Sequence, residues 1–175
     1  MALNLQNLDP LTRVRMLQEL DSDIEFGRLY NSDRLSSYGL QGWSGALRGA
    51  IEVGSDETLV RWLEQPGRLN SHEPRNTKNG TSMVKVPITA PQTLAEGEFN
   101  RFYMRGVCLR AKEEGKKTVT AYRAKQVAAP RAESRAIEGK LFEAEELLKD
   151  LRSNIGTDTA LGLPPGPNSG MSVKL

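Results

Sequence analysis

Apolar residues recur at three- and four-residue intervals in several parts of the chain, which is the spacing of an amphipathic helix. The first such stretch follows Asp9, a favoured N-cap residue, and Pro10, which suits the first helical position. The expected buried face of this helix carries Leu11, Val14, Leu17 and Leu20. A second, shorter helix is predicted in residues 54–67, GSDETLVRWLEQPG, where Ser55 or Asp56 caps the start and Pro66-Gly67 ends it.

The longest periodic stretch spans residues 93–114 and ends before Gly115, a residue suited to a C-terminal cap. Its regularly spaced residues are Phe99, Phe102, Tyr103, Gly106 and Leu109. Because they share one helical face, we expect them in the core. A last helix is predicted over residues 142–153, FEAEELLKDLRS, with Phe142, Leu147, Leu148 and Leu151 on its apolar side.

Alternation of polar and apolar residues predicts strands over residues 83–88 and 116–125. Pro87 places the first of these at a sheet edge, with one face buried. The polar residues 67–81 are interpreted as an exposed loop, and the glycines of residues 30–50 argue against a long helix there. The expected fold class is therefore α+β: a small helix-rich domain whose two- or three-stranded sheet is covered by helix 93–114.

The ends of the chain differ from this domain in composition. Residues 1–8 are interpreted as an N-terminal extension, residues 9–153 as the α+β domain, and residues 154–175 as an extended Gly/Pro-rich C-terminal arm. At roughly 3.1 Å per residue, 20 residues of such an arm reach about 60 Å. We expect both ends to contact neighbouring subunits and the arm to be dispensable for folding. Its expected anchors are Leu161, Leu163, Met171, Val173 and Leu175.

Composition narrows the class of protein further. No run approaches the roughly 18 apolar residues of a membrane helix, and the N-terminus lacks the basic and apolar regions of a signal peptide. A single cysteine, Cys108, rules out a disulfide within the chain. These features favour folding in a cytoplasm and no membrane partner.

The net charge of +2 conceals an uneven distribution, because residues 101–140 carry 11 basic and 4 acidic side chains. Arg110 lies near the aromatic side of its helix and is expected to be partly buried and paired. The other basic residues are expected to be exposed, and a polyanion or an acidic partner is their candidate ligand. They are Arg101, Arg105, Lys112, Lys116, Lys117, Arg123 and Lys125.

Signals for catalysis are weak. The one histidine, His72, stands in a polar segment, and one histidine with one cysteine makes a metal site implausible. Glu138-Gly139-Lys140 has the spacing of a nuclease Glu-x-Lys pair, but no convincing strand carries it. Cys108 is expected to be half-buried and inert. We therefore expect no catalytic residue, no cofactor, no metal and no small-molecule substrate.

The segments EFNRFYMRGVCLRAKEEG, TVTAYRAK and PRAES resemble small uncharacterised proteins of tailed phages and prophages. The resemblance covers residues 98–135 at most, and it transfers no site residue. It implies a non-enzymatic virion component, capsid-associated or head-to-tail connecting, which is assembled in the host cytoplasm. Its partners would be copies of itself or other particle proteins. The alternative is a nucleic-acid-binding accessory protein that contacts DNA through residues 101–140.

Overall fold

The structure is a computed structural model that describes residues 2–78, 80–156, 161–163 and 169–175. The described residues form six helices and two small antiparallel sheets, which confirms the predicted α+β class. The helices are α1 (Pro10–Glu25), α2 (Ser37–Val53), α3 (Asp56–Leu63), α4 (Ala90–Glu113), α5 (Ala132–Ile137) and α6 (Ala144–Ser153). The strands are β1 (His72–Thr77), β2 (Gly80–Lys85), β3 (Thr118–Arg123), β4 (Leu141–Glu143) and β5 (Met171–Lys174).

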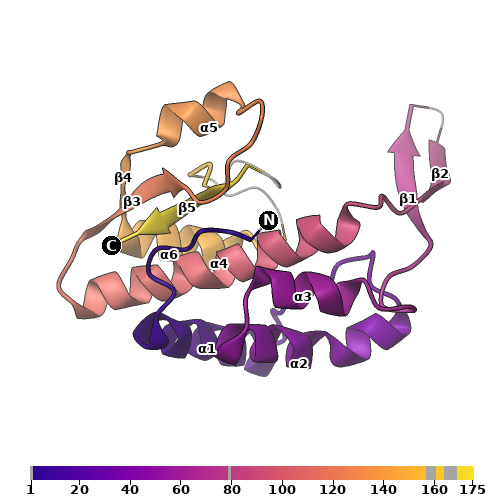
Figure 1. Cartoon of the computed structure of the whole chain (residues 1–175), viewed down its shortest axis with the longest axis horizontal. Coiled ribbons are helices and arrows are strands. Elements are labelled where there is room, and N and C mark those ends of the chain that lie inside the picture. The colour runs from indigo at the N-terminus through magenta and orange to yellow at the C-terminus, as the bar shows by residue number, and fades with distance from the viewer. Residues whose placement is uncertain (1, 79, 157–160, 164–168) are drawn as a thin grey trace.

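Helix α4 runs through the middle of the molecule. Helices α1, α2 and α3 lie on one side of it, and the three-stranded sheet and α6 lie on the other (Figure 1). Phe99, Phe102 and Tyr103 are at most 2% exposed, so the predicted aromatic core is confirmed. Other sides of the helix are buried as well, through Met104 and Val107. A helix that is buried all round is typical of the centre of a domain.

Helix α1 begins as predicted, since the Asp9 side chain accepts a hydrogen bond from the Thr12 N–H at 3.0 Å. Its predicted buried face is confirmed only at one end: Leu20 is fully buried and Leu17 packs against the core, but Leu11 and Val14 are exposed and Met16 is buried instead. Gly106 of α4 leaves room for α1 to approach closely on the side of Met16. A Cβ atom at position 106 would lie 2.8 Å from Cγ of Met16.

The glycine-rich residues 37–53 form helix α2, contrary to the prediction that the glycines argue against a long helix here. Two of the glycines are required by close contacts. A Cβ atom on Gly39 would lie 2.1 Å from the Arg68 carbonyl oxygen, and one on Gly42 would lie 2.8 Å from the Trp62 ring. These glycines therefore reflect tertiary packing, and they do not break the helix.

The larger sheet has the strand order β4-β3-β5, with both pairs antiparallel, and β3 confirms the strand predicted within residues 116–125. Strands β1 and β2 form a separate hairpin in which His72 pairs with Lys85 and Thr77 with Gly80. Residues 67–81 are thus not simply a loop. The strand predicted over residues 83–88 ends before Pro87, and within β2 only Val84 is even partly buried.

The C-terminal residues do not form the extended arm that the sequence predicts. Leu163, Met171 and Val173 are fully buried in the protein's own core, and β5, which carries Met171 and Val173, completes the sheet beside β3. The Asn100 side chain secures this strand: it donates to the Met171 carbonyl at 2.8 Å and accepts from the Ser172 hydroxyl at 2.6 Å. The alternation of residues 171–174 is that of a strand, although the preceding Gly/Pro composition predicted an arm. Residues 157–160 and 164–168 lie outside the described part of the chain.

The remaining expected anchors are less buried, since Leu175 is half-buried and Leu161 is 42% exposed. The N-terminal residues also contact their own domain. The Leu3 N–H donates to Asp56 at 3.0 Å, the Asn4 N–H donates to the Ala124 carbonyl at 2.8 Å, and the Leu175 N–H donates to the Asn7 side chain at 3.1 Å. The residues at both ends of the chain therefore pack on their own domain. Among the described helices, none combines the length and the apolar character needed to cross a membrane.

We expect Met171→Ala to lower the free energy of unfolding by about 2–5 kcal/mol, because it removes a buried side chain between β5 and the core. Truncation after Asn154 deletes β5 entirely and should abolish cooperative unfolding. Urea denaturation followed by circular dichroism measures both effects. Leu161→Ala is the matched control, since this side chain is partly exposed. A truncated chain with the melting temperature of the full chain would contradict this role of β5.

Candidate functional site

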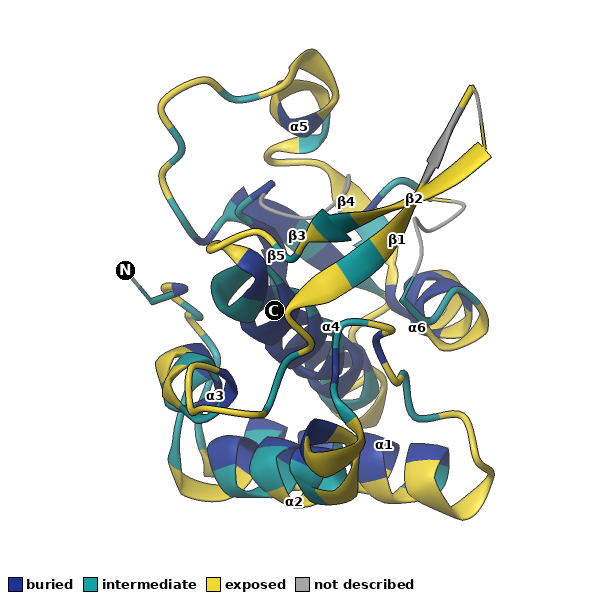
Figure 2. Cartoon of the chain, turned by 90° about the vertical axis from the view of Figure 1, so that its right-hand side faces the viewer, coloured by how far each residue is buried: buried dark blue, intermediate teal, exposed yellow. Residues whose placement is uncertain are grey.

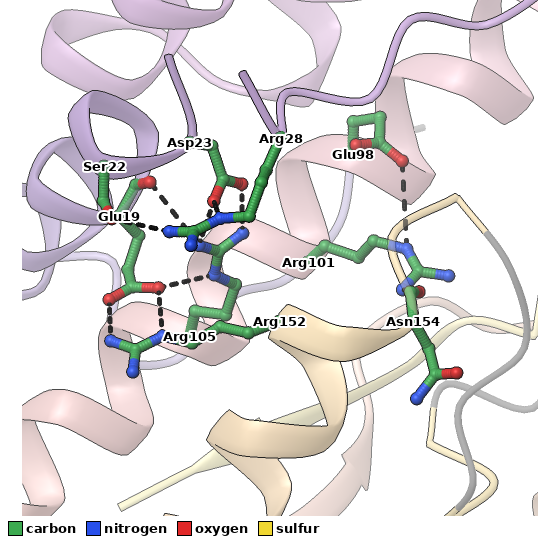
Figure 3. A network of polar contacts seen from close by, with 9 residues as sticks. All are labelled: Glu19, Ser22, Asp23, Arg28, Glu98, Arg101, Arg105, Arg152 and Asn154. Carbon is green, nitrogen blue, oxygen red and sulfur yellow. Dashed lines mark hydrogen bonds and ion pairs between the residues drawn. The ribbon is translucent and has the colours of Figure 1, made fainter. Parts of the chain in front are cut away.

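The basic segment does not form the exposed surface that its composition predicts. Arg105 is only 3% exposed and lies between α4 and α1 (Figure 3). Its guanidinium donates to Glu19 Oε2 at 2.7 Å and, through two nitrogens, to both carboxylate oxygens of Asp23 at 2.5 and 2.9 Å. This bidentate geometry is the strongest form of a charged hydrogen bond. The prediction that Arg105 meets an external partner is therefore wrong.

Two further arginines, each with a side chain that is 46% exposed, contact these carboxylates from the surface. Arg152 of α6 donates from Nε to Glu19 Oε2 at 2.9 Å, and Nε of Arg28 lies 3.8 Å from Asp23 Oδ1. Burial opposes ionisation of Glu19, but hydrogen bonds and charges from Arg152 and Arg105 outweigh it and hold the pKa of Glu19 below its ordinary value. Burial likewise opposes the charge of Arg105, yet Asp23 and Glu19 raise the pKa of this guanidinium. The network thus links α1, α4 and α6 through side chains that are all charged.

Three more of the predicted cations are mostly buried. The Arg123 side chain is 6% exposed, pairs with Glu138 at 2.9 Å and donates to the Ser169 carbonyl at 3.1 Å. The Lys125 side chain is 18% exposed and pairs with Glu96. The Arg101 side chain is 13% exposed and donates to the Asn154 carbonyl at 2.8 Å. Their expected exposure is wrong as well.

The other cations that the sequence predicts as contact residues lie at the surface. Lys112 pairs with Glu145 at 3.1 Å, Lys116 pairs with Glu114 at 3.0 Å, and Lys117 is exposed. Arg110 is partly buried and paired with Asp9 and Glu114, as predicted. Carboxylates outside residues 101–140 therefore pair with Arg105, Arg110, Lys112 and Lys125, while Arg131, Arg135 and Lys140 at the end of the segment are exposed.

Glu98 is a buried carboxyl beside this network. Its Oε1 lies 3.8 Å from Nε of Arg101 (Figure 3). Burial raises its pKa from 4.5 to about 7, because desolvation outweighs the attraction of Arg101 and Arg105, and the charge of Asp23 adds to the rise. Glu98 is thus a buried carboxyl whose protonation changes near neutral pH.

The β1–β2 hairpin is the feature that the sequence analysis missed. It projects from the rest of the domain (Figure 1), and most of its described residues are exposed (Figure 2). Its base is held by Arg34, which donates from Nη2 to Glu73 at 3.2 Å, and by the Asn70 side chain, which donates to the Leu35 carbonyl at 3.0 Å. Met83 is 64% exposed and Ile88, just after β2, is 98% exposed. The Asn79-Gly80 turn signal was the available clue to the hairpin, although Asn79 itself lies outside the described residues.

A cleft of about 340 Å³ opens between α3 and the start of α4. Its charged lining residues are Asp56, Glu57, Arg61, Glu64 and Glu96. Asp56 is 2% exposed, and burial raises its pKa even though it accepts the Leu3 N–H. The cleft is mainly acidic, and nothing in the local spacing of these residues indicates that they converge.

The other candidate residues do not converge on a site. His72 is exposed at the base of the hairpin, and its Nδ1 lies 3.0 Å from the Ser71 hydroxyl. Cys108 is fully buried, deeper than predicted, and burial raises its pKa to about 12. Glu138 pairs with Arg123, while Gly139 takes a positive φ of 82° before β4. Within the described ranges, no group of three His, Cys, Asp or Glu residues is placed to hold a metal ion.

Comparison of the chain with known protein families, with curated proteins and with solved structures gives no match. The contacts and exposure of the described residues are therefore the basis of the functional argument.

We expect Arg105→Met to destabilise the protein by about 3–5 kcal/mol, because it leaves Glu19 and Asp23 buried with one fewer cation. Adding Glu19→Gln and Asp23→Asn should restore part of this loss, since the unpaired charges are removed. Lys117→Met, at an exposed position, is the control. Urea unfolding of the four proteins, wild type included, measures the differences. A loss below 1 kcal/mol for Arg105→Met would contradict the structural role of the network.

The raised pKa of Glu98 predicts a specific pH dependence. Between pH 4.5 and about 7 the folded state retains a proton that the unfolded state has released, so the contribution of Glu98 to stability falls as pH rises through this window. Glu98→Gln should remove this fall and be more stable than wild type at pH 8 by about 2–4 kcal/mol, at about 1.4 kcal/mol per pKa unit. Urea unfolding from pH 5 to 8 provides the measurement, with exposed Glu133→Gln as the control. Equal pH slopes for wild type and Glu98→Gln would show that Glu98 ionises normally.

Proposed function

We propose that the protein is a non-enzymatic assembly protein that contacts neighbouring copies of itself through the β1–β2 hairpin. The observation that supports this function is the combination of a projecting hairpin, exposed along most of its described length, with a base fixed by Arg34 and Asn70. This element replaces the C-terminal arm as the candidate contact. The residues expected to anchor that arm, Leu163, Met171 and Val173, serve the protein's own core.

A hairpin of this kind gains stability from a neighbour. An isolated two-stranded hairpin is marginally stable in water, because its side chains bury little apolar surface and its outer edges lack pairing. Here Met83 and, just beyond β2, Ile88 are the large apolar residues with high exposure. Packing against a second protein would remove both from water, so a subunit contact accounts for an element that contributes little to its own domain.

The resemblance of residues 98–135 to tailed-phage proteins is consistent with this role. In that setting the protein would be a virion component, capsid-associated or head-to-tail connecting, which is assembled in the host cytoplasm. The alternative, DNA binding through residues 101–140, is less favoured because Arg101, Arg105, Arg123 and Lys125 contact groups of the same chain. DNA is retained as a competing outcome of the test.

The proposal is tested by replacing residues 72–85 with two glycines. The Ser71 carbonyl accepts a hydrogen bond from the Val86 N–H at 3.0 Å. Residues 71 and 86 are therefore close enough for the two glycines to connect them. We expect the replaced protein to keep a cooperative thermal transition but to lose self-association. Size-exclusion chromatography with light scattering, across a concentration series, measures the association.

Self-association equal to that of the full chain would contradict the assignment to the hairpin. A full chain that is monomeric at every concentration would contradict self-assembly, and a shift only on addition of duplex DNA would favour the nucleic-acid alternative.

A further inference from the structure

The two outer edges of the β1–β2 hairpin differ in their ability to accept another strand. The Val86–Ser71 hydrogen bond and the strand register place residues 71, 73 and 75 in hydrogen-bonded pairs with residues 86, 84 and 82. In an antiparallel ladder the intervening residues direct their N–H and C=O groups outward. Position 74 on β1 and positions 83 and 85 on β2 therefore define the two edges.

Proline closes one of these edges. Pro74 has no N–H at the outward position of β1, and proline at an edge is a common obstacle to strand addition. On β2, Met83 and Lys85 retain both backbone groups, and the next proline, Pro87, lies beyond the strand. The outer edge of β2 is thus the edge suited to pairing.

We propose that this edge of β2 pairs antiparallel with the same edge of β2 in a second copy of the chain, about a two-fold axis at Met83. The inference rests on the proposed assembly function and names its contact. The two Met83 residues would face each other as a hydrogen-bonded pair. An isologous contact of this kind closes as a dimer, and it joins two hairpins into a four-stranded sheet.

The edge is self-complementary in this register. Lys85 of each copy lies opposite neutral Thr81 of the other, so no like charges face each other directly. Pro74 is paired with Met83 within each hairpin and shares its face. The dimer would therefore carry an unbroken row of four apolar residues across its centre, two from each copy.

Charge on the hairpin predicts how salt affects this contact. Arg75, Lys78 and Lys85 are exposed, whereas Glu73 is paired with Arg34. Two such hairpins repel each other at low ionic strength, and salt screens the repulsion. Self-association should therefore strengthen between 50 and about 500 mM salt, whereas binding to DNA weakens as salt is added.

The decisive variant is Met83→Pro, studied in the full-length protein. Because the Met83 N–H points away from β1, proline there removes no bond within the hairpin, just as Pro74 removes none on the opposite strand. We expect the dimer dissociation constant to rise at least about tenfold, a change of 1.4 kcal/mol. Met83→Val, which keeps the N–H, should dimerise like wild type. Sedimentation velocity at several concentrations measures the constants.

A second variant reports on the contact without relying on proline. Met83→Cys should form a covalent dimer under mild oxidation, since position 83 meets itself across the axis at a separation within disulfide range. Arg75→Cys, on the other strand, should not. Native Cys108 is fully buried and does not compete.

If Met83→Pro dimerises as tightly as the wild type, the proposed edge pairing is overturned. Equal cross-linking of the two cysteine variants would overturn it as well. If replacement of residues 72–85 still abolished assembly, the hairpin would remain the contact and only its geometry would be wrong. Unchanged assembly in both the replaced chain and Met83→Pro would overturn both proposals.

Discussion

The buried pairing of Arg105 with Glu19 and Asp23 is the interaction on which the arrangement of the helices depends. A guanidinium and two carboxylates can leave water only where each finds its partners, so α1 must present Glu19 and Asp23 to α4. Arg152 of α6 also donates to Glu19, so α6 must lie where its arginine reaches this carboxylate. Apolar packing supplies much of the driving force, and these charges favour the orientation in which Glu19 and Asp23 of α1 face α4.

This constraint has a consequence at the surface. Because α1 directs its carboxylates toward α4, Leu11 and Val14 are turned to solvent at 62% and 49% exposure. The basic segment shows the reverse, because several of its cations are turned toward the protein. Contacts within the same chain are made by Arg101, Arg105, Arg123 and Lys125. The surface available to partners is therefore not the one that residue composition indicates, and the projecting β1–β2 hairpin becomes its most distinctive element.

The two sheets have different roles. The β4-β3-β5 sheet packs on α4 and incorporates the C-terminus, so it belongs to the stability of the domain. The hairpin stands apart, with Pro74 on one edge and an edge free of proline on the other. An element that adds little to its own core and has one accessible edge is suited to contact between subunits, which connects the physical asymmetry of the hairpin to the proposed assembly function.

The sequence by itself determined the features that depend on neighbouring residues. These include the capping of α1 by Asp9, the aromatic core of α4 around Phe102, the strand β3 and the α+β class. Tertiary structure decided what depends on distant residues: the helical state of the glycine-rich α2, the inward face of α1 and the burial of Met171 in β5. The candidate site belongs to the second group, because neither the neutralisation of Arg105 nor the exposure of Met83 follows from local spacing. Burial and pairing are set by the partner that a residue meets across the fold, and helical periodicity carries no information about that partner.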